Sequence, residues 1–206
     1  MDKIADLLIA IAIICFILLA VVIIATYFYY KQVKKVEKSL LRSSDRNANL
    51  AYLLLKNAFS SSRILRHPIL TMPNGQKAQS DLILVEGGGV YVIRVKDLSG
   101  MIDNSNRSVW TVTNSNGTNE FSNPFEQNRS ALNAIDYILK KEHLYNVPKH
   151  NITVFTQKRV AFKIRTERLT TAERLTETIK DINSNKFLSS REINNVIMAL
   201  KKYTSK

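Results

Sequence analysis

Two apolar runs around three consecutive glycines constrain this chain more than any other feature. The first run is Asp81 to Val85, the second is Val90 to Lys96, and Gly87 to Gly89 lie between them. Short runs of this kind favour β-strands, and glycines can adopt the positive φ values that a tight reversal needs. The sequence therefore predicts a β-hairpin, and we expect all three glycines to supply those φ values.

The predicted hairpin places charged side chains close together at its open end. Side chains two residues apart on a strand point to the same face, so Arg94 and Lys96 share a face. A turn centred on Gly88 puts Asp81 across from about Val95, within reach of either base. We therefore expect one acid and two bases at the end of a largely apolar hairpin.

This arrangement resembles PD-(D/E)xK nucleases, which carry an Asp on one strand and a (D/E)-x-K triplet on the next. Asp81, a glycine hairpin and Val92–Lys96 follow one another in an order that resembles the motif of the nuclease-related domain (NERD) family, which belongs to that superfamily. The similarity continues through Gly100, Trp110, Asn123–Gln127 and Leu188–Ile193, and it covers roughly residues 45 to 204. The resemblance implies a restriction-endonuclease-like core.

The resemblance also assigns roles to individual residues. Asp81 would be a ligand of Mg²⁺ in an active enzyme, and Lys96 would position the attacking water or stabilise charge on the phosphorus. Gln127 would orient that lysine or contact phosphate. Asp81, Lys96 and Gln127 are therefore the candidate catalytic residues, and Asp81 is the candidate metal ligand.

The chain departs from the family pattern where the metal would bind. Arg94 stands where the usual Glu-x-Lys triplet has its glutamate, and Asn47 or Asn49 falls near the place of a helix glutamate. A guanidinium a few ångströms from a metal site repels the metal ion. Asp81 would instead pair with Arg94. This predicts a catalytically degenerate member that needs no cofactor, with Mg²⁺ as the cofactor if the chain is active.

The N-terminal segment predicts a membrane anchor over residues 1–30. Leu7 to Ala25 contains no charged residue and, at ~1.5 Å per residue, is part of a run long enough to cross a bilayer. A cleaved signal peptide would have a basic start and a shorter apolar run. Tyr27 to Tyr30 would lie at the interface, and the following lysines would place the C-terminal domain in the cytoplasm and the N-terminus outside. We expect a basic linker over 31–45 and the nuclease-related domain over 46–206.

The basic charge suggests a polyanionic partner. The chain has a net charge of +13, with 30 Lys and Arg against 17 Asp and Glu. Such a surface suits nucleic acid or an anionic membrane. The candidate nucleic-acid-binding residues are Arg94, Lys96, Lys158 and Arg159, although a solvated surface would show the same pattern. A homodimer or another protein partner is also considered.

The remaining periodicity predicts one α/β (α+β) domain with a mixed sheet flanked by helices. We expect a first helix over Asn49–Phe59 with Leu50, Leu53 and Leu54 facing the core. Other expected strands are 63–72, 108–113, 151–155 and 160–164, and other expected helices are 124–141, 171–182 and 192–202, with Asn123, Thr170 or Thr171, and Ser189 as their caps.

Three functions remain open at this stage. The first is a membrane-anchored, degenerate nuclease-related protein that binds nucleic acid or a partner. The second is an active metal-dependent DNase, and the third is a membrane scaffold that binds anionic lipid. The single cysteine, Cys15, excludes a disulfide within the chain, and the glycine triplet lacks the Lys-Ser/Thr of a P-loop.

Overall fold

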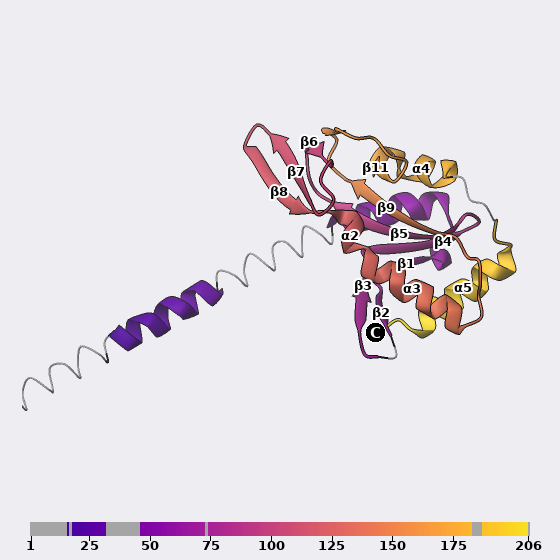
Figure 1. The fold of residues 1–206 in the computed structure, drawn as a ribbon, viewed down its shortest axis with the longest axis horizontal. Coiled ribbons are helices and arrows are strands. Elements are labelled where there is room, and N and C mark those ends of the chain that lie inside the picture. The colour runs from indigo at the N-terminus through magenta and orange to yellow at the C-terminus, as the bar shows by residue number, and fades with distance from the viewer. Residues whose placement is uncertain (1–15, 17, 32–45, 73, 183–186, 206) are drawn as a thin grey trace, which may run out of the picture. The chain divides into compact units, whose positions relative to one another are not determined.

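The computed structural model describes residues 16, 18–31, 46–72, 74–182 and 187–205 (Figure 1). The chain divides into two compact units, Met1–Ser43 and Ser44–Lys206. Among the described residues, no helix is both long and apolar enough to span a membrane. Residues 7–15 and 17 of the expected span lie outside the described residues, and so do residues 32–45 of the expected linker.

The second unit is built on a five-stranded mixed sheet. The sequence predicts a mixed sheet flanked by helices, but it does not predict the further sheets of four and two strands. Its strand order is β1-β4-β5-β9-β11, in which β1, β4 and β5 are antiparallel neighbours and β5, β9 and β11 are parallel neighbours. The strands are β1 (Ile64–Arg66), β4 (Leu82–Glu86), β5 (Gly89–Lys96), β9 (Lys149–Phe155) and β11 (Leu169–Thr171).

Helices cover both faces of this sheet (Figure 1). A helix over residues 46–58 and α4 (Leu175–Asp181) pack on one face, around Leu84, Tyr91 and Ile152. On the other face, α3 (Arg129–Lys141) and α5 (Ser190–Lys202) pack around Ile83 and Val92. Neighbouring residues of β4 and β5 therefore face different layers, which is why Leu82–Val85 and Val90–Ile93 are unbroken apolar runs.

A second, four-stranded sheet has the order β10-β6-β7-β8 and its own apolar cluster around Trp110 and Phe155. Its strands are β6 (Gly100–Asp103), β7 (Val109–Asn114), β8 (Gly117–Ser122) and β10 (Val160–Phe162). The remaining elements are the hairpin of β2 (Ile69–Thr71) and β3 (Lys77–Gln79), the short helix α2 (Pro124–Gln127), and two 3₁₀ turns, Ser61–Arg63 and Ala172–Arg174.

The central hairpin forms as predicted, but its register and turn differ. Leu82 pairs with Ile93 and Glu86 pairs with Gly89, so the same register places Asp81 opposite Arg94 and not opposite Val95. Of the three glycines only Gly89 has a positive φ, of 129°. A Cβ atom there would lie 2.3 Å from the carbonyl oxygen of Pro148, so this position needs glycine for space as well.

Three local predictions are wrong. In the first helix Ala51 and Leu55 face the core, whereas Leu50 and Leu53 are exposed. The buried stripe is therefore rotated relative to the predicted one. The predicted strand over 63–72 breaks into a 3₁₀ turn and two strands, since the backbone leaves the extended region at His67, whose φ is 44°. No threonine hydroxyl caps the helix after β11.

The other caps are confirmed. The Asn123 side chain accepts a hydrogen bond from the backbone of Phe125, and Ser189 with Glu192 forms a complete capping box at the start of α5. The helix expected over 124–141 is divided into α2 and α3 at Asn128. This division places Gln127 and Asn128 at a junction beside β5.

Candidate functional site

The end of the central hairpin and the α2–α3 junction form the candidate site. Asp81 directly precedes β4, and Arg94 and Lys96 lie near the end of β5, on the strand face that the alternation predicts. Gln127 and Asn128 approach from the helix junction. Asp81, Lys96 and Gln127, the three residues singled out in the sequence, therefore lie together with Arg94.

Asp81 is buried and both of its carboxylate oxygens are engaged. Oδ2 accepts a hydrogen bond of 2.7 Å from the backbone N–H of Val95. Oδ1 accepts a bond of 3.2 Å from Nη1 of Arg94, and the two side chains are only 12% and 17% exposed. This ion pair is largely removed from water, so each charge needs the other to offset the cost of its burial.

Arg94 donates to four oxygen atoms at once. Besides Asp81 Oδ1 they are Asn128 Oδ1 at 3.2 Å and the backbone carbonyl oxygens of Gln79 at 3.2 Å and Gln127 at 3.3 Å. A guanidinium has five N–H donors in a fixed planar fork, so it can satisfy such a set of acceptors. The guanidinium therefore lies inside a cage of oxygen atoms drawn from two separate segments, residues 79–81 and 127–128.

Two hydrogen-bonded asparagines, Asn128 and Asn151, support this cage and were not identified from the sequence. Asn128 is fully buried and donates to the carbonyl oxygen of Val92 at 3.2 Å and to Asn151 Oδ1 at 2.8 Å. Asn151 in turn donates to the carbonyl oxygen of Phe125 at 2.9 Å. Asparagine is unfavourable in the interior of a helix. Its presence within the predicted helix over 124–141 was therefore the signal from which Asn128 could have been identified.

Lys96 donates a 2.8 Å hydrogen bond from Nζ to Oε1 of Gln127, and Nζ lies 6.0 Å from the centre of the Phe121 ring. Burial lowers the pKa of Lys96, and the charge of Arg94 lowers it further, whereas Asp81 raises it. The sequence prediction that Gln127 orients this lysine is consistent with the contact. The side chain remains half-buried at the edge of the site.

The pKa of Lys96 gives a test of these electrostatics. Below its folded pKa the charged Lys96 lowers the stability of the fold. This cost is relieved as the pH rises through the folded pKa toward 10.5, the usual pKa of a lysine. We expect NMR titration of Nζ to give a midpoint below 10.5, the usual pKa of a lysine. Arg94→Gln should raise the midpoint and Asp81→Asn should lower it. A midpoint at or above 10.5 would contradict the burial of this amine.

The residues present do not fit a divalent metal ion. Among the described residues no three His, Cys, Asp or Glu side chains gather at one place. The other acids near the hairpin are occupied elsewhere: Glu86 accepts from Arg63 at 2.5 Å, and Asp97 accepts from Gln157 at 2.5 Å. Asn49 accepts a hydrogen bond from Arg66. Asp81 alone would bind the ion, beside the positive charge of Arg94.

Lys158 and Arg159 lie in the exposed loop between β9 and β10. The loop starts next to the site, because the backbone N–H of Thr156 donates to the carbonyl oxygen of Lys96 at 3.0 Å. Within the described part of the chain, however, no contact joins these two basic side chains to Arg94 or Lys96. The site as built consists of the hairpin end and the helix junction.

Comparisons with known proteins give one family. A model of the nuclease-related domain (NERD) matches residues 34–156. The matched range contains the whole hairpin, the α2–α3 junction and β9, and therefore every residue of the site described above. Comparisons with curated proteins and with solved structures found no match.

Proposed function

The chain belongs to the nuclease-related domain family, and from this premise we propose that it binds nucleic acid at a membrane without cutting it. The family indicates a nuclease-like protein. The proposal adds that Arg94 has taken the place of the metal-binding carboxylate, so that the nuclease framework is retained for binding. A protein partner in place of nucleic acid is the other form of this hypothesis.

The single observation that carries the proposal is the oxygen cage around Arg94. Carboxylate, amide and carbonyl oxygens are the ligands that Mg²⁺ prefers. Here four such oxygens accept hydrogen bonds from one guanidinium, with Asp81 among them. The arginine thus supplies, from within the chain, the positive charge that balances Asp81. A metal ion would have to displace it or tolerate its repulsion.

Binding of a polyanion follows from the charges that remain. Residues 1–30 contain one Lys and two Asp, so residues 31–206 carry a net charge of +14. Lys96, at the edge of the site, and Lys158 and Arg159, on the adjoining loop, are cations that phosphate groups could neutralise. Contacts to phosphate carry no sequence information, so we expect little sequence preference.

We expect the full chain, purified in a mild detergent, to bind duplex DNA with a dissociation constant of about 10⁻⁴ to 10⁻⁶ M at physiological salt. The logarithm of affinity should fall linearly with the logarithm of salt concentration, and Lys158→Gln with Arg159→Gln should reduce that slope by about 1 to 2. The matched control is Lys56→Gln with Lys77→Gln, which removes two exposed charges elsewhere. Absence of binding at low salt would refute the nucleic-acid hypothesis.

The membrane location is part of the proposal and rests on the uncharged sequence from Leu7 to Ala25. The described helix over 18–31 is consistent with it, because Leu18, Ile23 and Phe28 are all exposed. The positive-inside rule puts the nuclease-related domain in the cytoplasm. We expect the chain to fractionate with membranes and to resist extraction by carbonate or high salt. Recovery of residues 31–206 from cells as a cleaved, soluble form would contradict the anchor.

An active metal-dependent DNase remains the second candidate. The observation in its favour is that Lys96 and Gln127 keep a direct contact at the position that the family motif gives them. Activity would require a metal site that the donor set around Asp81 does not supply. The two candidates therefore differ in one measurable property, which is cleavage that depends on Asp81.

A further inference from the structure

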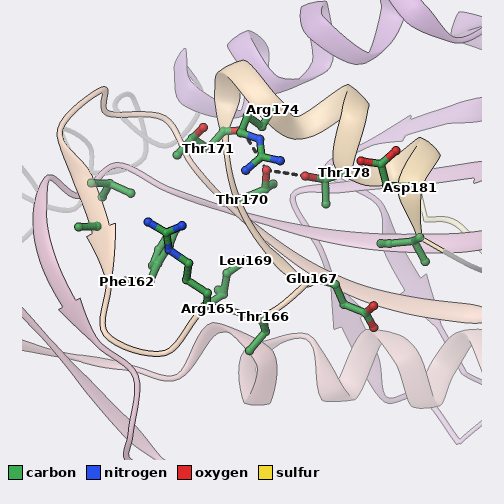
Figure 2. Close-up of a pocket in the computed structure, with 13 residues that line it drawn as sticks. Phe162, Arg165, Thr166, Glu167, Leu169, Thr170, Thr171, Arg174, Thr178 and Asp181 are labelled. Carbon is green, nitrogen blue, oxygen red and sulfur yellow. Dashed lines mark hydrogen bonds between the residues drawn. The ribbon is translucent and has the colours of Figure 1, made fainter.

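A pocket of about 380 Å³ lies apart from the Arg94 site, between β10, β11 and α4 (Figure 2). β10 and β11 are edge strands of the two larger sheets, and residues 163–168 connect them directly. The volume is within the range of roughly 300–1,000 Å³ typical of small-molecule sites. The pocket lining contains none of Asp81, Arg94, Lys96 and Gln127.

Two arginines supply the positive end of this pocket. Arg165 and Arg174 extend toward the space from opposite walls (Figure 2). Arg174 uses Nε for an exposed ion pair of 3.1 Å with Glu177, and no other described residue forms a hydrogen bond or ion pair with its two Nη groups. Among the described residues, none forms a hydrogen bond or an ion pair with the side chain of Arg165. Two guanidinium forks facing one space suit a phosphate group.

The pocket also has an apolar wall and hydroxyl groups. Phe162 is half-buried, and its ring packs against Phe155 with the ring centres 5.2 Å apart, which fixes its position. Leu169 lies beside it in the same cluster. Thr170 is buried and its hydroxyl shares a 2.8 Å hydrogen bond with the hydroxyl of Thr178 (Figure 2). A flat, partly polar ring is the ligand chemistry that such a wall accommodates.

Acidic groups lie at the other side of the pocket. Glu167 and Asp181 stand away from the two arginines in the view of Figure 2. No ion pair joins either acid to Arg165 or Arg174 within the described residues. Carboxylates accept hydrogen bonds from amino groups. The lining therefore combines phosphate-binding groups, a surface for a ring, and acceptors for an amino group.

We propose that this pocket binds a nucleoside 5′-monophosphate with an amino-bearing base, with its phosphate between Arg165 and Arg174 and its base against Phe162. The same chemistry could come from a free nucleotide or from the 5′-phosphorylated end of a single strand. The inference goes beyond the proposed function and does not rest on it, because duplex binding through phosphate contacts needs no pocket.

The test is calorimetric titration of the full chain with AMP, adenosine and IMP. Adenosine should bind at least about tenfold more weakly than AMP, because it lacks the phosphate, and IMP about fivefold more weakly, because it lacks the amino group. Arg165→Gln and Arg174→Gln should each weaken AMP binding at least about tenfold. The matched control is Arg168→Gln, which removes an exposed charge from the same connection outside the pocket lining and should change affinity less than about twofold.

Competition distinguishes the two sources of the ligand. If a 5′-phosphorylated oligonucleotide displaces AMP and its 5′-hydroxyl counterpart does not, the ligand is a strand end; if neither displaces it, the ligand is the free nucleotide. Either result supports the pocket. Absence of AMP binding at millimolar concentration, equal binding of AMP and adenosine, or an equal loss in Arg168→Gln would overturn it. Unchanged thermal midpoints of the variants would show that they are folded.

Discussion

Replacing Arg94 with methionine should lower the free energy of unfolding by about 3–5 kcal/mol, because it leaves the buried Asp81 without its counter-charge. The loss is not confined to one contact. Asn128 Oδ1 and the carbonyl oxygens of Gln79 and Gln127 would also lose their hydrogen-bond donor. Asp81 would keep only the bond from the backbone of Val95. Methionine fills a similar volume, so the effect reports mainly on charge and hydrogen bonding.

Denaturant unfolding of the full chain measures this effect. The control is Lys163→Met, which breaks an ion pair with Asp103 whose lysine side chain is 58% exposed, and which should cost less than about 1 kcal/mol. Adding Asp81→Asn to Arg94→Met should recover part of the loss, because the unpaired charge is removed. An Arg94→Met variant as stable as Lys163→Met would show that the oxygen cage contributes little to the fold.

We expect the replacement of Arg94 with glutamate to produce a divalent-metal site, and we expect no such site in the wild type. The change removes the repelling cation and places a second carboxylate opposite Asp81 in the hairpin register. It also frees Asn128 Oδ1 and two carbonyl oxygens, which are suitable ligands for Mn²⁺. With a dissociation constant on the order of 0.1 mM, Mn²⁺ at 100 times that concentration would stabilise the variant by about 2.7 kcal/mol.

The readout for this variant is the shift of its thermal midpoint with Mn²⁺, together with calorimetry. Arg94→Gln is the matched control, since it removes the same positive charge without adding a carboxylate. We expect a large shift for Arg94→Glu, a small shift for Arg94→Gln and no shift for the wild type. Equal shifts in all three proteins would indicate metal binding away from the hairpin and would contradict the assignment of position 94.

The sequence predicts the hairpin well because its signals are local. Apolar runs and a glycine triplet can be recognised from neighbouring residues alone. The strand faces on which Asp81, Arg94 and Lys96 lie follow from the alternation of side chains along a strand. The register depends on the number of loop residues, which a run of three glycines leaves open, and the predicted partner of Asp81 was therefore wrong by one residue. The cap at Asn123 is equally local and is confirmed.

Features that depend on distant segments were not predictable in this way. Asn128 and Asn151 are 23 residues apart in the chain, and their hydrogen bond requires the position of α3 relative to β9. The buried face of the first helix is decided by the sheet on which it packs, so the predicted Leu50 and Leu53 are exposed and Leu54 is half-buried. The pocket beside Arg165 is formed by two sheet edges and α4, so its prediction requires their relative positions, which the sequence motifs do not give.

We propose that this nuclease-related chain does not cut nucleic acid, and incubation of the full chain with DNA and Mn²⁺ is the direct test. The comparison is with Asp81→Ala, prepared in the same way, so that contaminating nucleases appear equally in both samples. We expect no cleavage by the wild type above that of Asp81→Ala. Cleavage by the wild type that Asp81→Ala abolishes would show that the site is an intact metal-dependent nuclease despite Arg94.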